Sequence, residues 1–200
     1  MPPFERDAEG QPCLNGPLSG RRLSIIGCSG SGKTTLSRRL GDALEIPRLE
    51  LDALHHQADW TPLERERFRQ AVDEFMRHHE DWIIDGNYEA VADLVRSRCT
   101  DIIWLDLSLP RVLLRLFIRS LRRSVGRVEL WNGNRERLRD LCSLDPERSM
   151  VTWALQTHAR HPARFEALRT DPTLSHVTFH RIRSPREAAD LVRSVERTLG

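Results

Sequence analysis

The sequence predicts an α/β domain built on a mainly parallel sheet, and two observations support this class. Short apolar runs alternate with stretches of helical periodicity from Arg21 onward, as in strands that are joined by crossover helices. The first apolar run leads directly into a glycine-rich segment at residues 27–34, and an amphipathic helical pattern follows it. The sequence contains no internal repeat. We therefore expect residues 21–200 to form one continuous domain with a helical insertion.

The strands are predicted from short apolar runs that end at turn residues or aspartates. They are placed at residues 23–26, 48–51, 82–84, 102–107 and 177–179. Between the second and the third of these runs, Phe68, Val72 and Met76 recur at helical spacing and predict an amphipathic helix. Residues 109–168 are expected to hold two or three further helices.

The last helix has the clearest start signal in the chain. Ser184 and Glu187 form a capping box, and Pro185 stands at the first helical position, where proline is favourable. Leu191 and Val195 then belong to one apolar stripe. We therefore expect the domain to end with an amphipathic helix.

Composition narrows the class of protein. No apolar run approaches the roughly 18 residues that are needed to cross a bilayer. Residues 1–20 contain several prolines and no apolar core of a signal peptide, so they are expected to form a flexible leader. The 4 cysteines lack metal-binding spacing and are expected to be reduced thiols. A soluble cytoplasmic protein without a membrane partner follows as the prediction.

Lys33 is the single lysine among the 31 basic residues, and all the others are arginine. A coding bias toward arginine would explain the arginines but not this exception. A flexible ammonium reaches the β- and γ-phosphates of a nucleotide in a way that a planar guanidinium does not. The position of the lysine therefore indicates phosphate chemistry.

The segment G-C-S-G-S-G-K-T matches the phosphate-binding pattern G-x-x-x-x-G-K-[ST] at every defined position. Its N–H groups and the helix start behind it are suited to a polyphosphate. Lys33 is expected to neutralise the β- and γ-phosphates of ATP, and the hydroxyl of Thr34 to ligate Mg²⁺. The predicted nucleotide-binding residues are Gly27, Cys28, Ser29, Gly30, Ser31, Gly32, Lys33, Thr34 and Thr35.

Three aspartates lie at or near the ends of predicted strands, where doubly wound sheets bind their ligands. We assign Asp85, which precedes the flexible Gly86, to magnesium, and Asp52 to acceptor binding or general base catalysis. For both residues a turn-forming aspartate is the alternative. For Asp106 a structural role is favoured over contact with the nucleotide.

Arg111, Arg115 and Arg119 recur every four residues and lie along one face of a predicted helix. In a kinase such arginines close over the triphosphate and stabilise the charge on the transferred group. A basic stripe could instead follow nucleic-acid phosphates or form a solvated face. Because few acidic residues lie nearby, we favour the first interpretation, with Arg115 and Arg119 as catalytic residues beside Lys33 and Asp52.

Several strings together resemble the bacterial adenylate-kinase-like P-loop proteins that are often labelled DNA topology modulation proteins (FlaR-like). The resemblance covers most of residues 21–200. The phosphate loop is shared by a very broad group of proteins. The strings that are specific to this family are "DWIIDGNY" at residues 81–88 and "ELWNGNRE" at residues 129–136. Residues 49–54 and "DIIWLDL" at residues 101–107 also resemble the family. The wider kinase resemblance implies a three-layer P-loop kinase-like fold with five parallel strands, ATP as phosphoryl donor, and a lid between strands four and five, at about residues 120–145.

The resemblance also assigns residues. Arg115 and Arg119 match the arginines that begin the lid of adenylate kinases, and Asp85-Gly86 matches their Asp-Gly pair. Adenylate kinases continue with Phe-Pro-Arg, whereas this chain continues with Asn87-Tyr88, which disfavours AMP as acceptor. Asn87 and Tyr88 would suit a neutral acceptor, or would pack the turn. Trp131 would stack on a base or sugar, or would anchor a helix turn.

Two functions are therefore predicted from different classes. The first is an ATP-dependent phosphotransferase, a kinase acting on a small-molecule acceptor. The second is a nucleotide-dependent regulatory or DNA-associated P-loop protein, in which ATP acts as a switch. The net charge of +2 disfavours nucleic acid as a partner, because nucleic-acid-binding domains are usually far more basic.

Overall fold

The computed structural model describes residues 17–126, 129–134, 152, 155, 158 and 161–199, and it confirms the predicted α/β class. The strands are β1 (Arg22–Gly27), β2 (Arg48–Glu50), β3 (Trp82–Asp85), β4 (Asp101–Leu105) and β5 (Thr178–Ile182). The α-helices are α1 (Lys33–Leu44), α2 (Leu51–His55), α3 (Arg65–His78), α4 (Glu89–Arg96), α5 (Leu109–Val125), α8 (His161–Arg169) and α9 (Pro185–Leu199). Short 3-10 turns form η1 (Ala58–Trp60), η2 (Trp131–Gly133) and η3 (Pro172–Leu174).

The strands form one 5-stranded parallel sheet in the order β2-β3-β1-β4-β5. The chain winds from the central β1 to the β2 edge, returns to β3, and then crosses β1 to build β4 and β5. In such sheets the crevice beyond the carboxyl ends of the strands, where the winding reverses, is the usual ligand site. The glycine-rich loop leaves β1 at this crevice.

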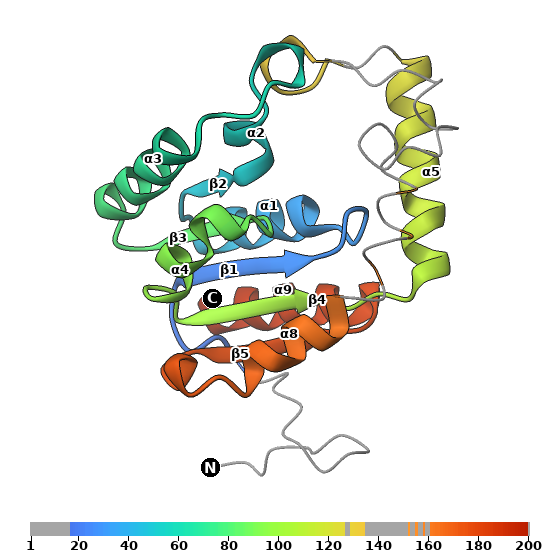
Figure 1. Cartoon of the computed structure of the whole chain (residues 1–200). Helices are drawn as coiled ribbons and strands as arrows, with labels where there is room; N and C mark the ends of the chain where they lie inside the picture. The colour runs from blue at the N-terminus through green and yellow to red at the C-terminus, as the bar shows by residue number, and fades with distance from the viewer. Residues whose placement is uncertain are drawn as a thin grey trace.

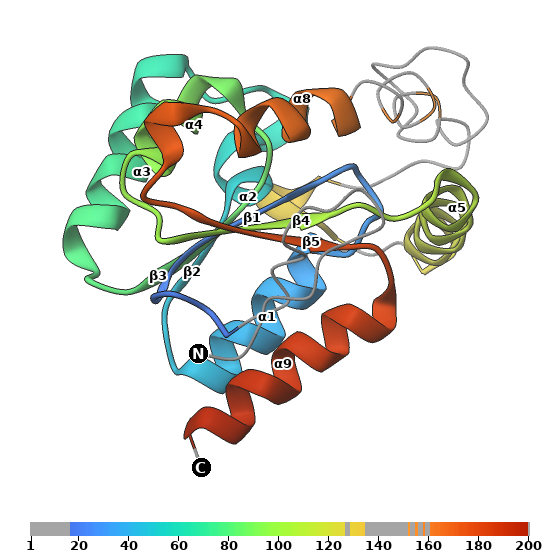
Figure 2. The same cartoon turned by 90° about the horizontal axis from the view of Figure 1, so that it is seen from below.

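Helices α1 and α9 cover one face of the sheet, whereas α3, α4 and α8 cover the other, as Figures 1 and 2 show from two directions. Successive strand residues point to opposite faces. Ile83 accordingly packs with α1 and α9, whereas its neighbours Trp82 and Ile84 pack under α3 and α4. Both faces of the parallel sheet are therefore buried, and the result is the three-layer architecture that was predicted.

Three predicted strand boundaries need correction. Leu51, placed at the end of the second strand, begins α2, and Asp106 follows the end of β4 instead of lying within it. The fifth strand is Thr178–Ile182, so it begins one residue later and continues further than predicted. An apolar residue at the end of a strand cannot be told by pattern from one that begins a buried helix. Leu51 is such a residue, since it is 2% exposed.

Helix α5 rises from the carboxyl edge of the sheet (Figure 1). The segment at residues 129–134 lies beside η1. The predicted lid at residues 120–145 includes the end of α5 and this segment; its other residues lie outside the described part of the chain. Among the described helices, none is both long and apolar enough to cross a membrane.

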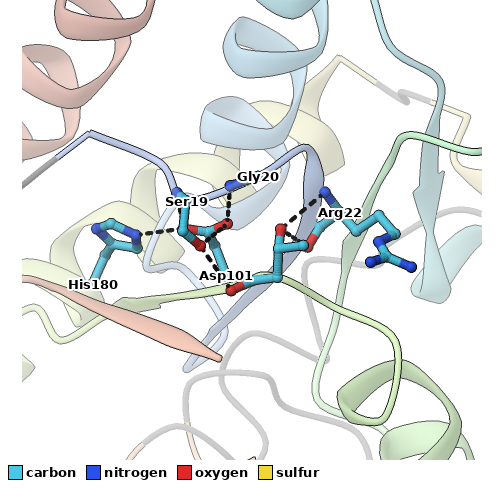
Figure 3. A network of polar contacts seen from close by, with 6 residues as sticks. Ser19, Gly20, Arg22, Asp101 and His180 are labelled. Atoms are coloured by element: carbon cyan, nitrogen blue, oxygen red, sulfur yellow. Dashed lines mark hydrogen bonds and ion pairs between the residues drawn. The ribbon is translucent and has the colours of Figure 1, made fainter. Parts of the chain in front are cut away.

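The chain just before β1 is attached to the opposite end of the sheet (Figure 3). The backbone N–H groups of Ser19 and Gly20 donate to the carboxylate of Asp101 at 2.8 and 3.0 Å, and His180 Nε2 lies 2.8 Å from the same carboxylate. Burial opposes ionisation, yet the hydrogen bonds from His180 and Ser19 lower the pKa of Asp101 below its ordinary value. Ser19 and Gly20, which were expected in the leader, thus belong to the packed domain.

Candidate nucleotide and acceptor site

The glycine-rich loop connects the end of β1 to α1, which begins at Lys33. Gly27, Gly30 and Gly32 have φ values of 148°, 79° and 101°, a region that residues with a Cβ rarely adopt. At Gly32, which caps α1, a Cβ would also lie 3.2 Å from a guanidinium nitrogen of Arg115. The loop therefore presents its backbone and the positive end of α1 to the cleft, an arrangement that favours a bound anion.

Asn87 fixes the first residue of this loop. Its Oδ1 accepts a hydrogen bond from Gly27 N at 3.1 Å, and its Nδ2 donates to Gly27 O. The preceding Gly86 packs against α2, because a Cβ there would lie 2.8 Å from Leu51 Cβ. Asn87 therefore packs the turn and braces the loop.

Lys33 and Thr34 lie at the centre of the site. The Lys33 ammonium donates to the carbonyl oxygens of Gly27 and Cys28 at 3.0 and 3.2 Å, so it lies over the loop. Thr34 Oγ1 donates to Glu50 Oε1 at 3.0 Å. Glu50 was missed by the sequence reasoning, although it ends β2. Asp52 was selected because it follows the predicted strand at residues 48–51. Had this strand been predicted to end at residue 50, as β2 does, the same criterion would have selected Glu50.

Asp85 lies beside Glu50, since the two residues pair in register at the ends of β3 and β2. Its side chain is buried, and its Oδ2 has no hydrogen-bond partner among the described residues. Burial, together with the nearby Glu50, raises the pKa of Asp85 to about 6, although Lys33 opposes this rise. A buried carboxylate oxygen without a partner is suited to a cation or to a water held by one.

The side chains around Thr34 offer oxygen donors, the kind of ligand that magnesium prefers. No three His, Cys, Asp or Glu side chains in the described part of the chain cluster closely enough to hold a metal ion by themselves. Magnesium at phosphoryl-transfer sites, however, is usually bound by one or two carboxylates, waters and the phosphates of the substrate. The Thr34 hydroxyl, Glu50 and the unpartnered oxygen of Asp85 fit such a shared ion.

Asp52 lies in the first turn of α2 and is held by Tyr88. The Tyr88 hydroxyl donates to Asp52 Oδ1 at 2.7 Å. Burial and the adjacent Asp52 raise the pKa of Tyr88 far above its usual range, so the phenol remains a proton donor. The rings of His55 and Phe68 pack 4.6 and 5.3 Å from the Tyr88 ring. Asp52 is thus attached to a partly buried aromatic cluster and is not a simple turn residue.

Asp106 has the structural role that the sequence favoured. Arg181 donates to its carboxylate through Nε at 2.9 Å, and its Nη2 lies 2.7 Å from the same oxygen. The same guanidinium stacks over Trp104 at 4.4 Å from the ring centroid.

Burial raises the pKa of the Cys28 thiol, which therefore remains uncharged inside the phosphate loop.

Helix α5 places the predicted arginines beside the loop. Arg115 Nη1 donates to Ser31 O at 3.0 Å. Leu116, on the adjacent face, packs against Gly30 so closely that a Cβ there would lie 2.6 Å from Leu116 Cγ. Arg119 lines the same cleft, and so does Arg123, which continues the four-residue spacing and was not selected from the sequence.

These residues line a cleft of about 550 Å³ along the carboxyl edge of the sheet. The cleft follows the order of the strands in the sheet. Residues after β5 line one end of it, the loop after β1 lines its middle, and residues after β2 line the other end. Gly27, Cys28 and Asp85 lie behind this lining. The lining residues are Ser29, Gly30, Ser31, Gly32, Lys33, Thr34, Thr35, Leu36, Arg38, Arg39, Glu50, Asp52, Leu105, Leu107, Arg115, Arg119, Arg123, Trp131, Ser184, Pro185 and Ala188.

Comparison with known proteins supports the fold. No protein-family model matches the chain, and no curated protein matches it. Among solved structures, a shikimate kinase from Bacteroides thetaiotaomicron is similar, with a TM-score of 0.51 and 15% identity over 89% of this chain and 97% of the other. A sugar kinase from Janibacter sp. aligns with a TM-score of 0.49 and 19% identity, over 90% of this chain and 94% of the other.

A gluconokinase from Sinorhizobium meliloti aligns with a TM-score of 0.48 and 19% identity, over 92% of this chain and 97% of the other. At these identities the likeness is one of fold. The shikimate kinase structure, together with the parallel sheet and the phosphate loop, shows that the chain has the P-loop kinase-like fold.

Proposed function

We propose that this protein is an ATP-dependent phosphotransferase that acts on a small hydroxyl-bearing acceptor. The observation that carries the proposal is the composition of the cleft. Its middle offers the helix start, the Lys33 ammonium and Arg115, whereas the β2 end offers the carboxylates of Glu50 and Asp52. A polyphosphate donor and a hydroxyl acceptor can therefore meet above Thr34.

Each side chain has a role in the proposed reaction. The loop N–H groups and Lys33 bind the β- and γ-phosphates, and Arg115 with Arg119 stabilises the charge on the moving phosphoryl group. Asp52, held by Tyr88, accepts the hydrogen bond of the acceptor hydroxyl and orients its oxygen for attack. The attacking oxygen bonds to the γ-phosphorus and gives its proton to the Asp52 carboxylate. The bond between the γ-phosphorus and the β–γ bridging oxygen breaks, and ADP leaves with that electron pair.

Magnesium would be held by Thr34, Glu50 and Asp85, directly or through water, together with the phosphates. When bound, it would supply charge neutralisation across the β- and γ-phosphates. The chain's own contribution is to keep Glu50 and Asp85 adjacent at two strand ends, with an Asp85 oxygen that has no partner among the described residues.

The strings "DWIIDGNY" and "ELWNGNRE" support placing the chain in the FlaR-like group of adenylate-kinase-like proteins. The structure also allows a physical interpretation of the first string. Asp85 would serve magnesium, Gly86 packs on α2, Asn87 braces the phosphate loop, and Tyr88 holds Asp52. The string thus joins the donor and acceptor parts of one phosphotransfer site.

The test combines nucleotide binding with turnover. Calorimetry on the full chain is expected to show magnesium-dependent binding of ATP. A screen of nucleosides, nucleotides, sugars and small alcohols is expected to show ADP release that depends on the acceptor. ATP binding without acceptor-dependent turnover, together with salt-sensitive binding of DNA, would instead support the nucleotide-dependent regulatory function.

A further inference from the structure

The segment at residues 129–134 is a built part of the site and not a passing loop. Asn134 is buried, with 5% of its surface exposed. Its Nδ2 donates to Gln57 O at 2.8 Å, and its Oδ1 accepts from Trp60 N at 2.9 Å. Asn132 Nδ2 donates to His56 O at 2.6 Å. One turn of chain is thus hydrogen-bonded to the backbone that follows α2, more than 70 residues earlier in the sequence.

This attachment places Trp131 in the cleft. The indole ring stacks on the His56 ring with centroids 6.0 Å apart and an interplanar angle of 23°. Trp131 also lines the cleft, together with Glu50 and Asp52 from the β2 end. His56 is only four residues beyond Asp52, so the tryptophan and the aspartate are held through the same short stretch of backbone.

The chemistry of this end of the cleft differs from that of the phosphate loop. Asp52, which is not among the side chains proposed for magnesium, repels an acceptor that carries a carboxylate or a phosphate near it. Carboxylate oxygens accept hydrogen bonds from hydroxyl groups, and Asp52 Oδ1 is already oriented by the Tyr88 hydroxyl. An indole offers a flat apolar face to the C–H face of a sugar ring or to the π face of a base.

Resting on the proposed function, we infer that the acceptor is a compound without an anionic group beside Asp52, with a flat face and neighbouring hydroxyls, held between Trp131 and Asp52. Trp131 is the specificity-determining residue, and Asn134 is the positioning residue that keeps it there. Neutral sugars and nucleosides share this chemistry, and the acceptor assay separates them.

The first arm of the experiment compares acceptor classes with the full chain and saturating ATP. Neutral sugars and nucleosides are tested beside sugar acids and nucleoside monophosphates. Phosphorylation of a neutral sugar or nucleoside, with at least about tenfold higher kcat/KM than for anionic relatives of the same size, is expected. An anionic compound as the best acceptor would overturn the inference and leave the kinase proposal intact. If no acceptor is phosphorylated although ATP binds, both proposals fail.

The second arm uses variants at the tryptophan. Trp131→Leu is expected to raise the KM for the acceptor by about tenfold while the KM for ATP stays unchanged, and Trp131→Phe should recover part of the loss. Phe117→Leu is the matched control, because Phe117 is a half-exposed aromatic residue of α5 that does not line the cleft. An unchanged acceptor KM in Trp131→Leu would refute the role of the indole.

The third arm tests the attachment. Asn134→Ala removes both side-chain bonds to the backbone after α2 and is expected to raise the acceptor KM in the same way, with ATP affinity retained. The double variant Asn134→Ala, Trp131→Leu should be no worse than Trp131→Leu alone, because both changes remove one contact. Additive losses in the double variant would show that Asn134 does not act through Trp131.

Discussion

The middle of the cleft and its β2 end are built in opposite ways. In the middle, one continuous loop supplies backbone N–H groups, and a helix start, Lys33 and Arg115 supply positive charge. At the β2 end, side chains from β2, α2 and η2 supply two carboxylates and an indole. The middle is therefore suited to any nucleoside triphosphate, whereas the β2 end is suited to a particular acceptor.

These two parts of the cleft therefore correspond to two proposed tasks, phosphate binding and acceptor selection. Phosphate binding uses main-chain groups, which every sequence possesses, and needs glycines to expose them. In the proposed function, acceptor selection would use side chains that meet only because β2, β3 and the segment after α5 converge. Tyr88 illustrates this convergence, since it follows β3 in the chain and yet holds Asp52 of α2. The predictions below test this division, from the largest expected effect to the smallest.

Removing the charge in the middle of the cleft should have the largest effect. Lys33→Ala is expected to lower turnover by about 10²–10³-fold, because an ammonium that neutralises the transferred phosphate is lost. The melting temperature should change little, since within the described part of the chain the ammonium donates to just two loop carbonyls. Lys33→Arg should be nearly as inactive, because a planar guanidinium fits the loop poorly. Normal ATP turnover by Lys33→Ala would refute the assignment of the loop.

Asp85 is expected to make the folded protein less stable in the absence of magnesium and nucleotide. Its pKa is raised from 3.8 to about 6, so the folded state binds the proton more tightly than the unfolded state does. The free energy of unfolding should therefore fall as the pH rises from about 4 to above about 6, by at most roughly 3 kcal/mol.

Asp85→Asn removes this effect, so the variant should be more stable than the wild type at about pH 8 and similar near pH 4. It should also lose phosphotransfer activity, since it lacks the carboxylate proposed for magnesium. Denaturant unfolding at several pH values measures the first effect, and ADP release measures the second. Equal stability of the two proteins at every pH would contradict the assigned burial penalty.

Within α5, the effect of an arginine should depend on how close it lies to the phosphate loop. Arg115→Ala is expected to lower turnover by roughly tenfold or more, because its guanidinium lies on the phosphate loop. Arg111→Ala, one turn earlier and exposed, is the matched control and should change turnover by less than about twofold. Steady-state kinetics with ATP as the varied substrate separates them. Equal losses in both variants would indicate a general electrostatic effect of the helix.

The smallest effect on activity is expected at Asp106. Asp106→Asn should leave turnover within about threefold of the wild type, because Arg181 already occupies this carboxylate. The melting temperature should fall slightly, in keeping with a partly buried ion pair worth about 1 kcal/mol. A large loss of turnover with an unchanged melting temperature would show that Asp106 acts on the nucleotide.

The sequence by itself determined the parallel α/β class and the phosphate loop. These features could be predicted because they depend on residues that are close together in the chain. Apolar runs of strand length, glycines that permit positive φ, and the Ser184–Glu187 capping box all act locally, and the structure contains each of them.

Only the tertiary structure decided which side chains share the cleft. Glu50 was overlooked because a one-residue error in the end of β2 hid it. The choice for Asn87 between an acceptor and the turn stayed open because its bond to Gly27 spans 60 residues. Trp131 became part of the site through Asn134, which is 77 residues from the backbone carbonyl that it binds. Such contacts depend on strand order and on packing between distant segments, and no local pattern in the sequence specifies them.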